Sequence, residues 1–223
     1  MQATSRFERP RAVERVVERY VAVGDSFTAG VEPGAGSWAD ALADALRAVN
    51  PGLDYHNLAV AGAPSELVVE EQLEVALGLR PDLVTVICGA NDVLGSVRPD
   101  IGGYAARLAL MLERIGAESP EAAVITATIP DLSTHMPLRP RTRERVTRGM
   151  RHLNEATRSV ARRHGVVCLE FADHPQAGER VNFAGDGFHP SPEGNRRAAA
   201  AIMRALGGRF AIKTLTVEGP RAT

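Results

Sequence analysis

The stretch DLVTVIC at residues 82–88, followed at once by GAND at residues 89–92, decides the fold of this chain. Nearly every residue in the first part is β-branched or apolar, which is typical of a buried strand. A strand with one face in water would alternate polar and apolar residues, whereas this run does not. The stretch therefore predicts a strand of a parallel sheet that helices cover on both faces.

Helical patterns separate this strand from four other strand candidates. The expected strands lie at 20–24, 54–59, 82–88, 122–129 and 166–170, and apolar residues recur at helical spacing over 38–49, 65–79, 104–115 and 146–160. A last helix is expected to begin near Ser191, with Pro192 in its first turn. Strands joined by helices form parallel crossovers. We therefore expect an α/β fold, a single-domain three-layer α/β/α sandwich with about five parallel strands.

The length of 223 residues fits one domain of this kind, and no repeat or low-complexity linker divides the chain. We expect an N-terminal extension at 1–19, one folded domain at 20–208 and a C-terminal tail at 209–223. The tail alternates weakly between polar and apolar residues, so it could add an edge strand or lie loose. Hydrophobic residues make up 44% of the chain, which is enough for a sizeable core.

Charge and cysteine content limit the partners and the compartment. The chain has 26 basic and 27 acidic residues, so its net charge does not indicate nucleic acid or a membrane surface as a partner. No run approaches the ~20 apolar residues of a membrane span, and residues 1–19 lack the apolar stretch of a signal peptide. Cys88 and Cys168 lie in strand-like runs and are expected to be reduced. We expect a cytoplasmic protein; secretion without a cleavable signal stays open, as does the oligomeric state.

Ser26 directly follows the first expected strand, in the segment GDSFTAG at residues 24–30. Ligands bind beyond the carboxyl ends of the strands in an open parallel sheet, so this serine is expected at the binding edge. A serine hydroxyl is a weak nucleophile and needs an adjacent base. The alternative is a turn serine that caps the following segment.

The segment DGFHP at residues 186–190 could supply that base. Histidine is the usual general base near neutral pH. Asp186 comes three residues before His189 and could accept a hydrogen bond from the imidazole, which would fix its tautomer. The alternative is a surface loop with a solvent-exposed ion pair.

Two further segments follow expected strands and carry groups suited to a developing oxyanion. Gly62 ends the segment NLAVAG at residues 57–62 and could present its backbone N–H, while Asn91 in GAND could present its side-chain amide. Taken singly, Gly62 also fits a plain turn glycine, and Asn91 fits an asparagine bonded to its own backbone. The order in which the four segments occur makes their combination informative.

Together these four segments resemble the sequence blocks of the SGNH hydrolases, also called GDSL lipases and esterases, which supply Ser, Gly, Asn and His. The resemblance extends from about residue 21 to residue 197. Phe27 stands where the family name has leucine, and it is expected to pack rather than react. The resemblance implies a flavodoxin-like sheet and the hydrolysis of a carboxylic ester by an esterase, lipase or acylhydrolase.

The resemblance also implies a role for each site residue. Ser26 would be the nucleophile, His189 the general base and Asp186 the group that orients the imidazole. The backbone N–H groups of Ser26 and Gly62 and the side-chain amide of Asn91 would form the oxyanion hole. This chemistry requires neither a metal nor an organic cofactor, and the expected partner is a small-molecule, lipid or sugar ester.

Two other classes of function stay open from the sequence. One is a metal-dependent phosphoesterase, because Asp25, Asn91, Asp92, Asp186 and His189 are metal-capable, although two-metal sites need a denser set of carboxylates and histidines. The other is a non-catalytic binding protein with this fold. The acyl chain and the alcohol of the substrate, thioesters and lysophospholipids included, are not decided by fold and triad.

Two features near the expected site have plainer interpretations. His135 follows the fourth strand and could line a substrate pocket, but a surface loop is the favoured interpretation. The Arg-rich stretch 139–151 could meet an anionic substrate or a lipid headgroup. We favour a solvated helix face for it, because charge runs are most often that.

Overall fold

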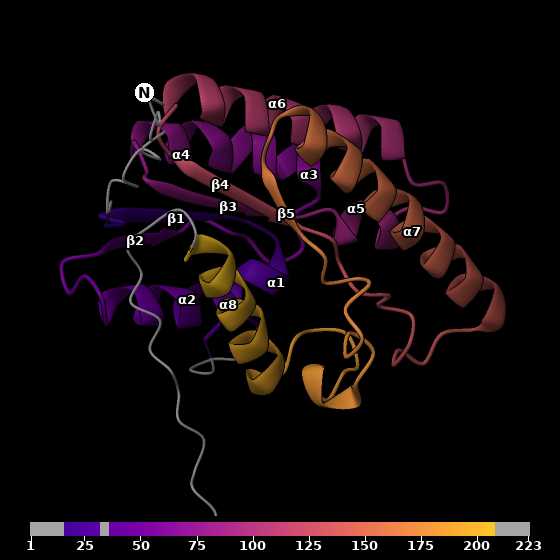
Figure 1. Cartoon of the computed structure of the whole chain (residues 1–223). Coiled ribbons are helices and arrows are strands. Elements are labelled where there is room, and N and C mark those ends of the chain that lie inside the picture. Colours follow the sequence, from indigo (N-terminus) through magenta and orange to yellow (C-terminus); the bar gives the residue numbers. More distant parts are fainter. Residues whose placement is uncertain (1–15, 32–35, 208–223) are drawn as a thin grey trace, which may run out of the picture.

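The computed structural model describes residues 16–31 and 36–207, and its centre is a parallel sheet of five strands (Figure 1). The strand order is β2-β1-β3-β4-β5, and every neighbouring pair is parallel. The strands are β1 (Arg19–Gly24), β2 (Asp54–Asn57), β3 (Leu83–Ile87), β4 (Ala123–Ala127) and β5 (Val167–Leu169). The five expected strands are therefore confirmed, with ends that differ by up to two residues.

Helices cover both faces of the sheet and complete the three layers. They are α1 (Ser26–Ala29), α2 (Trp38–Arg47), α3 (Ser65–Leu67), the π-helical turn η1 (Val68–Leu73), α4 (Glu74–Gly78), α5 (Ala90–Leu94), α6 (Ile101–Glu118), α7 (Pro140–Arg163), the 3₁₀ turn η2 (Arg180–Asn182) and α8 (Pro192–Leu206). Helices α2 and α8 pack together on one face, while α4, α6 and α7 lie on the other (Figure 1). None of the helices in the described part of the chain is long and apolar enough to cross a membrane.

The three central strands, β1, β3 and β4, bury residues on both faces, which explains their unbroken apolar sequences. In β3, Val84 and Val86 belong to the core beneath α6 and α7, whereas Leu83 and Ile87 belong to the core beneath α2 and α8. Thr85 lies between them, and its hydroxyl pairs with that of the buried Tyr20 at 3.0 Å. The predicted strand at 82–88 is thus covered on both sides.

The helix starts follow from local sequence. Ser37 accepts a hydrogen bond from the Asp40 N–H while the Asp40 carboxylate accepts one from the Ser37 N–H, so the two residues form a capping box for α2. Ser191 caps α8 through the Gly194 N–H, and Pro192 occupies the first turn as expected.

The helix expected over 65–79 is present but is not uniform. Its middle, η1, is a π-helical turn, and Gln72 within it is buried rather than on the solvent face. The Gln72 amide accepts a hydrogen bond from the Gly24 N–H at 2.8 Å and donates one to the Gly24 carbonyl at 2.9 Å. The helix therefore fixes the end of β1. Of the expected termini, residues 1–15 and 208–223 lie outside the described residues, so the tail at 209–223 stays a prediction.

Candidate active site

A tight turn after β1 presents Ser26 at the carboxyl edge of the sheet. Gly24 ends β1 with φ 156°, and a Cβ at this position would lie 2.2 Å from the Ile87 carbonyl oxygen, so only glycine fits between β1 and β3. Asp25 then caps α1 by accepting a hydrogen bond from the Phe27 N–H at 3.1 Å. Ser26 is the first residue of α1, and its side chain is buried against the loop that contains His189.

The structure brings together the serine, the histidine and the aspartate predicted from the sequence. The His189 Nε2 atom lies 3.1 Å from Ser26 Oγ, although 163 positions separate the two residues in the chain. On the other side of the ring, His189 Nδ1 lies 2.6 Å from Asp186 Oδ2. Such an arrangement can pass a proton from the hydroxyl to the imidazole while the carboxylate stabilises the resulting positive charge.

Asp186 is held as an anion in this loop. Burial raises the pKa of its carboxyl, but hydrogen bonds from His189 and from the backbone N–H groups of Phe188 and His189 outweigh that effect and hold the pKa below its ordinary value. Near neutral pH the group is therefore a hydrogen-bond acceptor only. An acceptor at Nδ1 favours the tautomer whose Nε2 is free to take the proton of Ser26.

Aromatic packing orients the imidazole. The Phe188 ring contacts the His189 ring edge-on with centroids 4.3 Å apart, and the Phe27 ring lies 5.9 Å from it. The two phenyl rings also meet edge-to-face at 5.2 Å. Phe27 thus packs rather than reacts, as expected. Gly187 has φ +71°, and a Cβ there would lie 2.4 Å from the His135 carbonyl oxygen, so the 186–190 loop needs glycine to pack this closely.

Asn91 and the Gly62 turn lie next to each other. Asn91 is on α5, directly after β3, and its side-chain amide donates a hydrogen bond to the Ala63 carbonyl at 3.2 Å. Gly62 precedes Ala63 and has φ +82°, a conformation that favours glycine. Because an amide nitrogen carries two hydrogens, one of them remains for another acceptor.

A partly buried polar cluster, formed by Ser65, Asp92 and Arg107, fixes the relation between these two turns. Asp92 accepts hydrogen bonds from the Ser65 N–H at 2.8 Å and from its hydroxyl at 2.5 Å. Arg107 on α6 donates to Ser65 Oγ at 2.7 Å and to Asp92 at 3.2 Å. Since Asp92 is next to Asn91 and Ser65 begins the helix after Gly62, this cluster holds both turns. The sequence pattern did not single out Ser65 or Arg107, and it indicated Asp92 as a metal-capable residue.

A second support ties the turn after β2 to the serine. Asn57, the first residue of the segment at 57–62, donates a hydrogen bond from its side chain to the Thr28 carbonyl of α1 at 2.8 Å. Its side-chain oxygen accepts one from the Ala59 N–H at 3.2 Å. The turn that carries Gly62 is therefore linked to the short helix that carries Ser26.

Asp25 is the most unusual ionisable group near the site. Burial raises the pKa of its carboxyl to about 7; the N–H of Phe27 acts in the opposite direction, and the negative charge of Asp92 raises the pKa further. Its Oδ2 atom is buried and has no hydrogen-bond partner among the described residues. Near neutral pH this carboxyl therefore titrates within the folded protein.

The remaining candidates lie outside this constellation. His135 is in a loop, where its ring contacts the Gly178 carbonyl at 2.9 Å and packs on Phe183. The Arg-rich stretch begins α7. Arg143 donates a hydrogen bond to the Met136 carbonyl of the preceding loop, and Arg145 donates one to the Val93 carbonyl of α5. Within residues 16–31 and 36–207, no group of three or more His, Cys, Asp or Glu side chains is arranged to hold a metal ion.

Comparison with known proteins identifies the family. The sequence matches the model of the GDSL-like lipase/acylhydrolase family over residues 22–197. The chain therefore belongs to this family, the SGNH hydrolases. No protein with a curated description matches the sequence.

Solved structures show the same fold. A GDSL-like lipase from Parabacteroides merdae, described as putative, is 17% identical with a TM-score of 0.74, over 89% of this chain and 99% of that one. A lipase/acylhydrolase from Enterococcus faecalis is 25% identical with a TM-score of 0.67, over 86% and 96%. A catalytic mutant of an acetylxylan esterase from Geobacillus stearothermophilus is 19% identical with a TM-score of 0.67, over 85% and 94%.

Proposed function

We propose that this chain is a serine hydrolase of carboxylic esters, with Ser26 as the nucleophile, His189 as the general base and Asp186 as the orienting carboxylate. The observation that carries the proposal is the pair of contacts on the two imidazole nitrogens, 3.1 Å to Ser26 Oγ and 2.6 Å to Asp186 Oδ2. Membership of a family of esterases and acylhydrolases supports the same conclusion.

In the proposed acylation step, His189 Nε2 takes the Ser26 proton while Oγ attacks the ester carbonyl carbon. The resulting oxyanion is held by the backbone N–H groups of Ser26 and Gly62 and by the Asn91 amide. Each such donor lowers the barrier by ~3 kcal/mol, which corresponds to roughly 10²–10³ in rate.

Collapse of the tetrahedral intermediate then breaks the ester C–O bond, and the imidazolium gives its proton to the leaving alcohol. In the second half of the reaction, His189 takes a proton from water, and the hydroxide attacks the acyl-enzyme. The same donors hold the second oxyanion, and the proton returns to Ser26 Oγ as the acid leaves. No metal or organic cofactor takes part in this scheme.

Hydrolysis of p-nitrophenyl acetate by the full chain tests the proposal. The proposal expects Ser26→Ala and His189→Ala each to lower kcat by at least 10³-fold, because the triad acts as a unit. Ser159→Ala on α7, away from the site, is the matched control and should keep wild-type activity. Activity that survives in Ser26→Ala would show that another group is the nucleophile.

Treatment with a chelator distinguishes the proposed serine hydrolase from a metal-dependent phosphoesterase. The proposed mechanism expects unchanged rates after dialysis against EDTA. Loss of activity with EDTA and recovery with a divalent metal would favour the metal-dependent hydrolase instead. A folded wild-type protein without turnover on any ester would favour the binding-protein alternative.

A further inference from the structure

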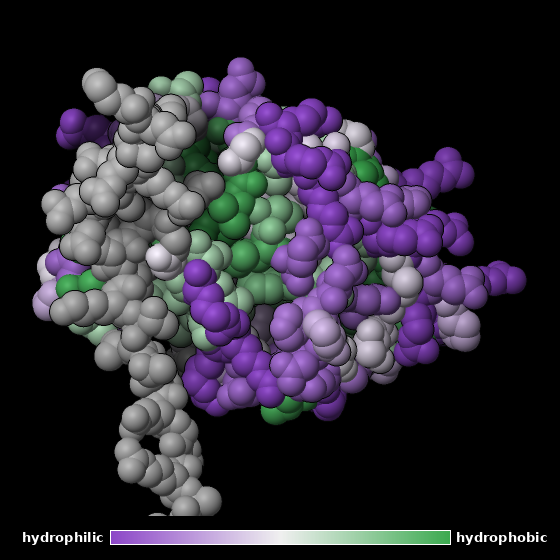
Figure 2. Space-filling model, in the orientation of Figure 1, coloured by the Kyte–Doolittle hydropathy of each residue, from purple (hydrophilic) through white to green (hydrophobic). Residues whose placement is uncertain are grey.

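An apolar cavity of about 400 Å³ lies between α8 and the chain segment that follows β5. Figure 2 shows it as a hollowed green area near the centre of this face, bordered by purple hydrophilic residues. Its walls include Trp38 from α2, Ile87 at the end of β3, Phe171 after β5, and Ala198 and Ala201 on α8. A volume of this size lies within the range of small-molecule binding sites.

The cavity adjoins the serine. Phe27 and Pro190 line this cavity and also line the small hollow at Ser26, so the same two side chains form the boundary between them. Phe27 directly follows Ser26 in the chain. Phe188 and Pro190, on either side of His189, also belong to the cavity wall. An ester at Ser26 would therefore lie next to this apolar cavity, with Phe27 and Pro190 at the boundary between them.

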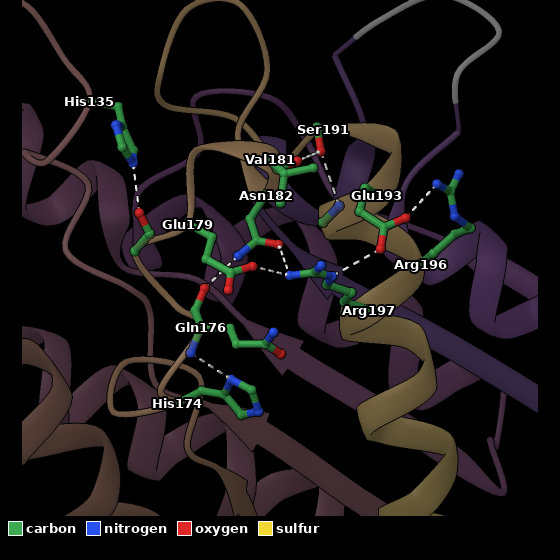
Figure 3. Close-up of polar contacts among 12 residues, drawn as sticks. His135, His174, Gln176, Glu179, Val181, Asn182, Ser191, Glu193, Arg196 and Arg197 are labelled. Carbon is green, nitrogen blue, oxygen red and sulfur yellow. Dashed lines mark hydrogen bonds and ion pairs between the residues drawn. The ribbon is translucent and has the colours of Figure 1, made fainter.

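A polar network joins α8 to the 174–182 loop at the edge of the cavity (Figure 3). From α8, the Arg197 guanidinium contacts Glu179 at 2.6 Å, Asn182 at 3.1 Å and Glu193 at 2.9 Å. The Asn182 side chain also donates to the Gln176 carbonyl at 2.7 Å. These contacts join the 174–182 loop to α8, so the cavity has a fixed polar rim above an apolar floor.

We propose that this cavity binds the hydrocarbon chain of the ester substrate. The inference rests on the proposed function, because it places the reacting ester at Ser26. At ~30 Å³ for each water-sized group, the cavity holds on the order of ten methylene groups. That is far more than an acetyl group fills, so the favoured substrates are esters with medium-length chains. Each buried methylene strengthens binding about fourfold.

The kinetic test compares two ester series. In one, p-nitrophenyl esters run from acetate to dodecanoate; in the other, acetate esters of linear alcohols run from ethanol to decanol. The proposal expects kcat/KM to rise at least 10²-fold along one series up to about ten carbons. A rise in the first series assigns the cavity to the acyl chain, and a rise in the second assigns it to the alcohol. Equal kcat/KM throughout both series would overturn the proposal.

A cavity-filling variant locates the effect. Ala201→Phe introduces a ring into the cavity, whereas Ala205→Phe, four residues later on α8, is the matched control because Ala205 does not line the cavity. We expect Ala201→Phe to lower kcat/KM for the decanoate ester at least tenfold more than it lowers kcat/KM for the acetate ester. Equal losses for both esters in the folded variant would overturn the assignment.

Direct binding separates this inference from the proposed function. Trp38 is the only tryptophan of the chain and lines the cavity, so its fluorescence reports occupancy. In the Ser26→Ala protein, decanoic acid or decanol should shift the Trp38 emission with saturation, and Ala201→Phe should abolish the shift. This readout needs no turnover, so it remains decisive if the ester assays fail. No saturable shift with either compound would overturn the proposal.

Discussion

Replacement of Asp25 by asparagine should remove a large part of the pH dependence of stability between about pH 4 and pH 7. The Asp25 carboxyl has an ordinary pKa of 3.8, and burial raises its pKa to about 7 in the folded protein. Below pH 4 the group is protonated in both states and has no effect. As the pH rises, the unfolded chain releases the proton first, so the free energy of unfolding falls until the folded form also ionises near pH 7.

The size of this effect follows from the two pKa values. The difference between 3.8 and about 7 corresponds to about 4 kcal/mol, at ~1.4 kcal/mol for each pH unit. An asparagine side chain is neutral at every pH and can still accept the hydrogen bond from the Phe27 N–H. Its second polar atom would replace an oxygen that has no partner, which adds a cost that does not vary with pH.

Urea unfolding of wild type and Asp25→Asn from pH 4.5 to pH 8.5 measures the effect. The stability difference between the two proteins should change by several kcal/mol in favour of the variant as the pH rises. Asp44→Asn is the matched control, because the Asp44 side chain is 77% exposed and so lacks the burial on which the Asp25 effect depends. A constant difference for Asp25→Asn as well would refute the argument from burial.

Three further substitutions have distinct expected results. Asp186→Asn should lower kcat by roughly 10³–10⁴-fold with little change in KM, because the imidazole loses the acceptor that fixes its tautomer; a loss under tenfold would contradict that role. Arg107→Ala should lower kcat roughly ten- to hundredfold with a smaller change in KM, because small displacements of the oxyanion donors slow the reaction. Arg107→Lys should restore part of the lost kcat. An equal loss of kcat in both variants at unchanged stability would argue against a positioning role for Arg107. Gly89→Ala should lower the free energy of unfolding, measured by urea denaturation, by at least ~2 kcal/mol. The reason is that φ of Gly89 is +116° and the new Cβ would lie 2.6 Å from Tyr104 and 2.8 Å from Leu153. A variant as stable as wild type would contradict this expectation.

The sheet was predictable because its signal is local. The three central strands are short apolar runs, and β3 shows this most clearly over Leu83–Ile87. The edge strand β2 (Asp54–Asn57) has a polar sequence and gives a weaker signal. The helices α6 and α7 repeat apolar residues at helical spacing over many turns, so their existence was predictable while their ends were not. The helices α1 and α5 have four and five residues, too few to show any period.

The reacting groups were predictable because each lies directly after a strand or in a short recognisable segment. The supporting residues were not, because their roles depend on contacts between distant elements. Gln72 is a polar residue in a helix with several glutamates, and only packing against Gly24 buries it. Arg107 belongs to α6 and meets Ser65 across 42 positions. The apolar cavity depends on the path of the 171–190 loop, which has no hydrophobic period.

The central claim is that the Ser26 hydroxyl is activated by His189, and covalent labelling tests it most directly. The protein is treated with a fluorophosphonate, digested, and its peptides are identified by mass spectrometry. We expect one adduct, on Ser26, that forms at least 10²-fold more slowly in His189→Ala and is absent in Ser26→Ala. An adduct on a different residue, or equally fast labelling of Ser26 without the imidazole, would contradict the claim.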